Sequence, residues 1–145
     1  MGKDPLQLVL AGEIAQGWEN REILDAVKEG AEGRRIVCTG PLADEDLVAL
    51  YNLAEAFVFP SWYEGFGLPL VEAMRCGAPV IASDRGALPE VAGDAGLIVP
   101  PDDPGALATA IRRIRDEPGL KGEMARRGLA RAAEYAWEKS GERLL

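Results

Sequence analysis

The sequence predicts an α/β fold in which helices cover a parallel β-sheet on both sides. Two observations lead to this fold class. Short apolar runs alternate with longer helical patterns along the chain, and each run is almost continuously apolar. Strands of a parallel sheet are buried on both faces, so they read as unbroken apolar runs rather than as alternating ones. Strand–helix alternation of this kind is typical of a sheet connected by crossover helices.

The expected strands and helices follow one another in order. We expect strands at the runs LQLVLA (6–11), RIVCT (35–39), AFVFP (56–60), PVIAS (79–83) and GLIVP (96–100). We expect helices at about residues 19–31, 43–55, 68–76, 86–92, 104–116 and 119–136. The chain has 145 residues and shows no repeat, low-complexity segment or linker, so a single domain over residues 1–145 is expected.

Several helix boundaries are marked by residues that favour them. Asp44 and Asp46 fall in the first turn of the helix expected to begin near residue 43, where negative charge interacts favourably with the helix dipole. Gly77 follows the next expected helix and is a typical stop signal. Asp103 is expected to cap a further helix, with Pro104 at its first position.

The composition excludes several classes of function. The net charge of −8 argues against nucleic-acid binding, which needs clustered Lys and Arg. The chain has no histidine, which removes His-based catalysis and most zinc sites. Cys38 and Cys76 are expected to be free buried thiols, so a reducing, cytoplasmic location is predicted. No apolar run approaches the roughly 20 residues of a membrane-spanning helix, and the N-terminal stretch is not expected to act as a secretory signal.

The stretch SWYEGFGLPLVEAM, residues 61–74, places two glutamates around a glycine-rich apolar run. Its first half follows an expected strand and therefore lies at the edge of the sheet where open α/β folds bind ligands. Gly65 and Gly67 allow a sharp turn and a close approach of the backbone to a ligand. The N–H groups of Phe66, Gly67 and Leu68 then point outward at the start of a helix, which suits phosphate or sugar hydroxyls.

The two carboxylates fit a polyol. An ionised carboxylate has two acceptor oxygens and can bind two neighbouring hydroxyls. Glu64 lies on the loop before the helix and Glu72 about one turn inside it, so they would contact different parts of one extended ligand. A nucleotide-sugar has that layout of hexose, diphosphate and ribose. Taken alone, Glu72 reads more readily as a solvated surface charge, so the prediction depends on the whole combination.

A family resemblance is carried by residues 60–111, PSWYEGFGLPLVEAMRCGAPVIASDRGALPEVAGDAGLIVPPDDPGALATAI. This segment closely resembles the C-terminal half of retaining, GT-B-fold glycosyltransferases, in the group with mannosyltransferases, sucrose-phosphate synthases and bacterial glycogen synthases. Their E-x7-E signature is complete as Glu64 to Glu72, and the likeness extends over nearly the whole chain. It implies a Rossmann-like domain, one half of a GT-B fold, that binds the donor of a hexosyltransferase.

The resemblance also implies a role for individual residues. Glu64 would be the catalytic residue, bound to donor hexose hydroxyls near the reacting carbon, and Glu72 would accept from the ribose hydroxyls. The hexose and diphosphate would be held by the backbone of Gly65, Phe66, Gly67 and Leu68. The nucleobase would lie beside the loop of Gly40, Pro41 and Leu42. Such enzymes are expected to need no metal and no cofactor, the donor being a nucleotide-diphosphate sugar.

The sequence departs from the family at its start. The family's domain usually opens with a further strand that ends in Gly-Arg and is followed by Lys, and these cations neutralise the donor diphosphate. Nothing here matches that segment, and Lys3 is not assigned its role. We therefore expect the acceptor domain to be missing from this chain and the chain alone to be inactive.

The unmatched strand is central in the family's strand order of 3-2-1-4-5-6. Its loss would leave open backbone groups and an apolar gap. We expect that family strands two and four close on each other, or that a neighbouring chain covers the gap. The exposed sheet or cleft surface would also favour a homo-oligomer.

Other functions stay open at this point. One is a non-catalytic nucleotide-sugar binding module that works with a separate acceptor subunit. Another is a GT-B relative with different chemistry, such as a sugar phosphorylase or an epimerase. A dinucleotide-binding oxidoreductase is disfavoured, because LVLAGEIAQG does not supply G-x-G-x-x-G after its strand.

Overall fold

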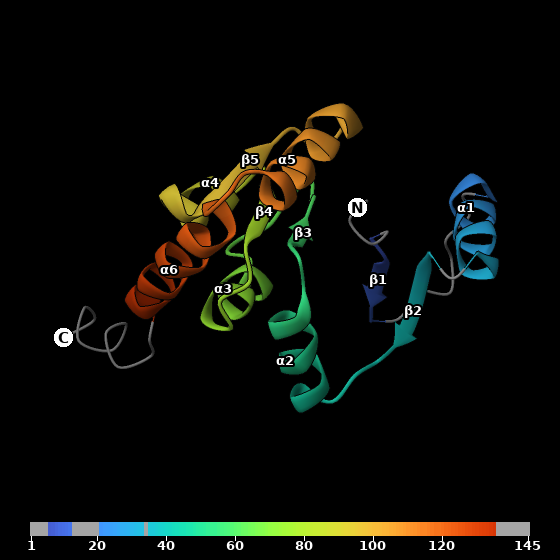
Figure 1. The fold of residues 1–145 in the computed structure, drawn as a ribbon, viewed down its shortest axis with the longest axis horizontal. Coiled ribbons are helices and arrows are strands. Elements are labelled where there is room, and N and C mark those ends of the chain that lie inside the picture. Colours follow the sequence, from blue (N-terminus) through green and yellow to red (C-terminus); the bar gives the residue numbers. More distant parts are fainter. Residues whose placement is uncertain (1–5, 13–20, 34, 136–145) are drawn as a thin grey trace. The chain divides into compact units, whose positions relative to one another are not determined.

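The computed structural model of the chain describes residues 6–12, 21–33 and 35–135. The chain divides into two compact units, residues 1–47 and 48–145, and each is described by itself (Figure 1). Both contain parallel strands flanked by helices, which confirms the α/β fold class. The single-domain division stays a prediction.

The first unit contains a two-stranded parallel sheet and one complete helix. Strand β1 (Leu8–Ala11) pairs with β2 (Ile36–Gly40), and α1 (Arg21–Glu32) lies between them in sequence. The helix packs closely on β2, because a Cβ built on Gly30 would lie 2.3 Å from Cδ1 of Ile36. No described residue of this unit is buried. The expectation of fully buried strands is therefore wrong here, since two strands and one helix offer too little apolar area to enclose a core.

The second unit contains a three-stranded parallel sheet with β4 in the middle. Its strands are β3 (Phe57–Phe59), β4 (Val80–Ser83) and β5 (Gly96–Val99). Its helices are α3 (Leu68–Arg75), α4 (Leu88–Ala92), α5 (Pro104–Asp116) and α6 (Leu120–Ala132), with short 3₁₀ turns η1 (Gly93–Ala95) and η2 (Ala133–Tyr135). All four residues of β4 are buried, as expected of a central strand.

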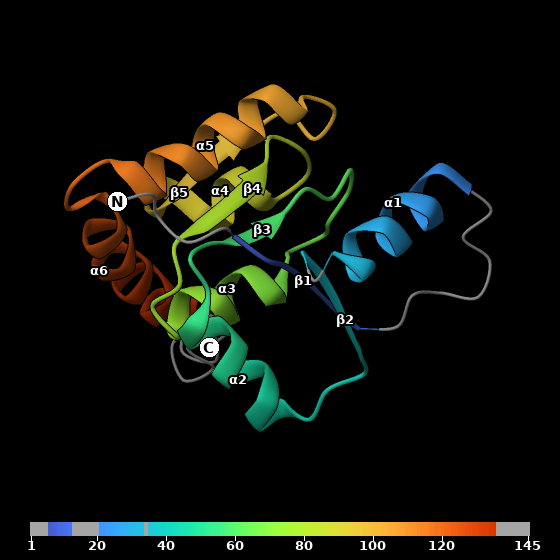
Figure 2. The same cartoon turned by 45° about the vertical axis from the view of Figure 1, so that its right-hand side comes forward.

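Helices cover both faces of this sheet, with α5 and α3 on opposite sides (Figure 2). Ile81 of β4 belongs to a core cluster with Ala110 and Ile114 of α5. The neighbouring Val80 points the other way, since a Cβ on Gly96 would lie 3.1 Å from Val80 and 3.0 Å from Ala92 of α4. This alternation is that of a strand buried on both faces.

The strands form two sheets rather than one. In the part of the chain that the structure describes, β1 pairs with β2 and β3 pairs with β4. Family strands two and four are β1 and β3 here. They belong to different units, so their expected closure stays a prediction. The break falls where the resemblance places the further strand.

The expected helix signals are confirmed. Helix α2 (Asp44–Leu53), which crosses the boundary between the units, has Asp44 and Asp46 in its first turn. The carboxylate of Asp103 accepts a hydrogen bond from the N–H of Ala106 at 2.9 Å and caps α5, with Pro104 at the first helical position. Parts of the helices expected at 19–31 and 119–136 lie outside the described residues.

Two further expectations concern the cysteines and the membrane. Cys38 and Cys76 are both free, as expected, but Cys38 is exposed and Cys76 is only half-buried. Cys38 lies on β2 of the first unit, where no described residue is buried, and Cys76 is the C-cap residue of α3. Among the described helices, none has the length and apolar character needed to span a bilayer.

Candidate functional site

The loop SWYEGFG connects the end of β3 to the start of α3, as the sequence predicts. Helix α3 begins at Leu68, Gly67 is its N-cap, and Pro69 occupies its first turn. The carbonyl of Gly67 accepts from the N–H of Leu70 at 2.9 Å. Gly67 has no side chain to cap the helix, so the first N–H groups are left for another acceptor.

Those N–H groups form the centre of the candidate site. Among the described residues, no acceptor is paired with the N–H of Phe66, Gly67 or Leu68. Pro69 contributes no N–H of its own. Free donors at the start of a helix, together with the positive end of its dipole, favour an anionic or hydroxyl-rich ligand.

Gly67 is required for the shape of this loop. Its φ of 89° lies in the left-handed region. A Cβ at this position would lie only 2.5 Å from Cδ2 of Leu88, which is fully buried. Gly65 differs, because a Cβ there would meet nothing within 4 Å. The space over Gly65 is thus open to a ligand, whereas Gly67 packs inward.

The carboxylate of Glu64 is oriented by two serines. The hydroxyl of Ser61 donates to Oε1 of Glu64 at 2.9 Å. The hydroxyl of Ser83, which is fully buried at the end of β4, donates to the carbonyl of Ser61 at 2.6 Å. Glu64 itself is half-buried. The ends of two neighbouring strands therefore fix the loop and aim its carboxylate.

The backbone of Glu64 rests on the turn that leads into α4. The N–H of Ala87 donates to the carbonyl of Glu64 at 3.2 Å. A Cβ on Gly86, whose φ is 58°, would lie 2.7 Å from that same carbonyl oxygen. Only glycine fits this close backbone approach, so the turn after β4 acts as a support for the loop after β3.

The second glutamate, Glu72, lies one turn inside α3 and is exposed. The hydroxyl of Tyr51 lies 3.4 Å from Oε2 of Glu72 and donates to it. Tyr51 is 6% exposed, and its ring packs edge-on against Phe57 with centroids 5.3 Å apart. Burial, together with the nearby Glu72 charge, raises the pKa of Tyr51 to about 12. The tyrosine therefore stays protonated and remains a donor to the carboxylate at neutral pH.

The structure brings most of the predicted residues into one stretch between β3 and α3. These are Glu64, Gly65, Phe66, Gly67, Leu68 and Glu72. The loop of Gly40, Pro41 and Leu42 belongs to the first unit and follows β2. There the carbonyl of Gly40 accepts from the N–H of Gly12 at 3.0 Å, which joins the ends of β1 and β2. The predicted roles of all these residues stay predictions.

Aromatic and charged side chains flank the loop. Trp62 and Tyr63 are 62% and 81% exposed, and the guanidinium of Arg85 lies 5.8 Å from the centroid of the Trp62 ring. Arg85 also forms an ion pair with Asp84 at 3.0 Å. No cluster of three or more metal-ligating side chains occurs in the described ranges.

The loop lies outside one hollow of this unit that could hold a ligand. A shallow hollow of about 590 Å³ lies between β5 and α5 and is lined by Ile98, Asp103 and Arg112 among others. It has no carboxylate pair and no free helix start. The chemistry of the Glu64 loop, rather than a cavity, therefore marks the candidate site.

Three supporting residues were missed by sequence reasoning. Ser61 and Ser83 each follow or end an apolar run, so their place at the edge of the sheet was visible, but their hydrogen bonds were not. Tyr51 gave no signal, because its contact with Glu72 spans 21 residues and depends on how α2 packs on α3.

The sequence of this chain matches a known protein family. Residues 2–117 match the family described as glycosyl transferases group 1. The O-antigen chain mannosyltransferase B of Escherichia coli is 43% identical over 131 residues, which cover 90% of this chain and 34% of that protein. The chain thus spans about a third of the length of this relative.

Solved structures agree with the fold. Sucrose-phosphate synthase from Thermosynechococcus elongatus is 40% identical, with a TM-score of 0.78 over 92% of this chain and 35% of that one. Anabaena HepE in complex with UDP-glucose has the same TM-score of 0.78 at 24% identity, over 88% of this chain and 36% of that one. The second likeness concerns the fold alone.

Proposed function

This chain belongs to the group 1 glycosyl transferases, and we propose that it is the part of such an enzyme that binds the nucleotide-sugar donor. The observation that carries the proposal is the loop between β3 and α3. It combines free N–H groups at a helix start with one carboxylate on each side, Glu64 and Glu72. The solved structure of HepE with UDP-glucose supports this ligand class by analogy of fold.

Each part of the donor has a counterpart in this proposal. The diphosphate lies at the N–H groups of Phe66, Gly67 and Leu68, where the helix dipole favours negative charge. Glu64, aimed by Ser61, binds hydroxyls of the hexose next to the carbon that reacts. Glu72 accepts from the ribose hydroxyls. The loop of residues 40–42 belongs to the first unit, and its role beside the base stays a prediction.

The chemistry proposed for the complete protein is transfer of the hexose to an acceptor with retention of its anomeric configuration, without a metal. As the glycosidic bond breaks, negative charge grows on the diphosphate, and preorganised N–H groups stabilise that charge. This chain covers 34% of the length of the mannosyltransferase. The acceptor is therefore proposed to bind a part of the complete enzyme that lies outside this chain. We expect no sugar transfer by the 145-residue chain alone.

Calorimetric titration tests the proposal. The chain is titrated with UDP, GDP and ADP and with their hexose conjugates. We expect one base to be preferred, and we expect Glu64→Gln to weaken the sugar conjugate about tenfold while the free diphosphate binds as before, because only the hexose contacts Glu64. Glu72→Gln should weaken both ligands, because both carry the ribose.

Glu45→Gln is the matched control, since Glu45 is an exposed glutamate of α2 outside the loop. It should leave both affinities unchanged. Binding that is equally insensitive to the Glu64 and Glu72 variants would contradict the assigned roles. Absence of binding by every nucleotide and conjugate would contradict the donor-binding function itself.

A further inference from the structure

We propose that Arg131 is a positioning residue for the donor loop, by which we mean residues 64–67. Arg131 lies on α6 and forms hydrogen bonds both to helix α4 and to Tyr135. The N-terminal end of α4 and the ring of Tyr135 each contact the donor loop. The inference rests on the proposed function only in its consequence for donor affinity. The effect on the shape of the loop is independent of any ligand.

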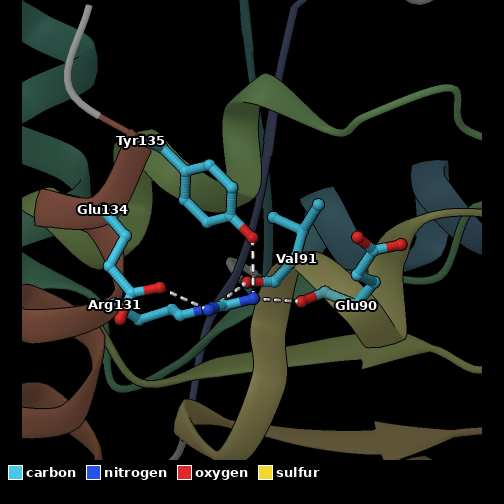
Figure 3. A network of polar contacts seen from close by, with 5 residues as sticks. All are labelled: Glu90, Val91, Arg131, Glu134 and Tyr135. Carbon is cyan, nitrogen blue, oxygen red and sulfur yellow. Dashed lines mark hydrogen bonds and ion pairs between the residues drawn. The ribbon is translucent and has the colours of Figure 1, made fainter. Parts of the chain in front are cut away.

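The guanidinium of Arg131 is the centre of a polar network (Figure 3). Its Nε donates to the carbonyl of Val91 at 3.1 Å, and its Nη2 donates to the carbonyl of Glu90 at 2.6 Å. These are among the last carbonyls of α4, which lack partners within so short a helix. Arg131 therefore holds the C-terminal end of α4.

Two other groups complete the network. Nη2 of Arg131 also donates to the hydroxyl of Tyr135 at 2.8 Å, and Nη1 pairs with Glu134 at 2.5 Å. The guanidinium carbon lies 5.1 Å from the centroid of the Tyr135 ring. Only arginine offers five donors in one planar fork, so lysine could not make these bonds together.

Helix α4, whose C-terminal end is bonded to Arg131, contacts the donor loop through its N-terminal end. The N–H of Ala87, just before α4, donates to the carbonyl of Glu64. The side chain of Leu88, the first residue of α4, packs against the Cα of Gly67 so closely that no Cβ fits there. A displacement of α4 would therefore move both ends of the loop.

Tyr135 contacts the loop at Phe66, between the contacts that α4 makes at Glu64 and Gly67. Its ring meets the Phe66 ring edge-on, with centroids 5.3 Å apart and planes at 84°. Phe66 is otherwise 38% exposed and carries one of the free N–H groups of the site. Arg131 thus fixes both supports of the loop relative to each other, and the loop cannot shift without breaking one of them.

Helix α6 is itself well placed for this role. A Cβ on Gly128 would lie 3.4 Å from Cγ of Met74, so α6 approaches α3 closely. Arg131 therefore projects from a helix that is packed on the same α3 whose N-terminus forms the site. If Arg131 only capped α4, loss of its hydrogen bond to Tyr135 would not change the conformation of the loop.

Amide hydrogen exchange and chemical shifts of the ligand-free chain separate the two roles. We expect Tyr135→Phe, which keeps the ring and both bonds from Arg131 to α4, to shift the amide resonances of residues 65–68. We expect Arg131→Lys to shift them further and to speed the exchange of the Ala87 amide, which donates to the carbonyl of Glu64, about tenfold, because bonds from a charged donor are lost. The resonances of β4 should stay in place in both variants.

Arg127→Ala is the matched control, since Arg127 lies one turn earlier on α6 and bonds to Glu123 and to the carbonyl of Asp94 instead. It should leave residues 65–68 unchanged. Changes confined to α4 in Arg131→Lys, with Tyr135→Phe identical to the wild type in the loop, would overturn the proposal and leave a simple helix cap.

The same variants extend the test to the donor. With the nucleotide-sugar preferred by the wild type, we expect Tyr135→Phe to weaken binding several-fold and Arg131→Lys about tenfold, with effects that are less than additive in the double variant. Unchanged affinity in both variants would remove the link to function. If the wild type binds no nucleotide-sugar, the proposed function fails, while the ligand-free resonances still decide whether Arg131 positions the loop.

Discussion

Replacement of Gly67 by alanine should strongly destabilise the second unit. A φ of 89° costs a residue with a Cβ about 1–2 kcal/mol. The new Cβ would lie 2.5 Å from Cδ2 of Leu88, and normal carbon–carbon contacts begin near ~3.5 Å, so the leucine must move by about 1 Å. Leu88 is fully buried, and forcing extra volume into a packed core costs about 1–3 kcal/mol. The two effects together predict a loss of about 2–5 kcal/mol in the free energy of unfolding.

Urea denaturation followed by circular dichroism measures this loss. With a slope of about 1–3 kcal/mol per molar urea, the midpoint should fall by about 1 M or more. Gly65→Ala is the control on the same loop, because its φ is not left-handed and a Cβ there meets nothing within 4 Å. That variant should stay within about 0.5 kcal/mol of the wild type.

A double variant separates the two contributions. In a Leu88→Ala background the clashing Cδ2 is gone, so Gly67→Ala should cost only the backbone term of about 1–2 kcal/mol. Equal stability of Gly67→Ala and Gly65→Ala would refute the reasoning. The same full cost of Gly67→Ala with and without Leu88 would refute the clash.

Three further predictions follow from single contacts. The pKa of Tyr51 is raised to about 12 in the folded chain, so the stability that the tyrosine contributes is present below pH 10 and is lost as the pH rises through 12. When the free energy of unfolding is measured against pH, Tyr51→Phe should reduce this alkaline loss by about 2 kcal/mol. An unchanged pH dependence in the variant would contradict the prediction. Asp103→Ala removes the cap of α5 and should lower the free energy of unfolding by about 1 kcal/mol, whereas Asp103→Asn should retain most of it. Ser61→Ala frees the carboxylate of Glu64 and should weaken the preferred nucleotide-sugar about tenfold without affecting the free nucleoside diphosphate.

The second unit was largely readable from the sequence because its signals are local. The apolar run at 79–83 predicts a buried central strand, and β4 occupies Val80–Ser83 with every residue buried. Asp103 and Pro104 predict the start of α5 to the residue. Runs, caps and stops depend on neighbours in the chain, so a single sequence carries them.

The first unit shows where local signals stop. Its runs look like those of buried strands, yet Leu8 is 50% exposed in β1. Burial depends on which strands and helices lie beside a strand; β1 pairs with β2, and α1 packs on β2. An apolar run thus predicts a strand, but it does not tell how much of that strand is covered.

The candidate site was predictable in its ligand-facing residues and not in their supports. Glu64 and Gly67 belong to one compact pattern with a physical reason for each position. Ser83, Tyr51 and Arg131 act through hydrogen bonds across 21 or more residues of sequence. Such contacts follow from the packing of helices and strands, which no spacing in the sequence encodes.

The most direct test of the central claim is a crystal structure of this chain with its preferred nucleotide-sugar bound. We predict that the phosphate oxygens lie at the N–H groups of Phe66, Gly67 and Leu68, with the hexose hydroxyls on Glu64 and the ribose hydroxyls on Glu72. A donor bound instead in the hollow between β5 and α5, with both carboxylates empty, would contradict the account.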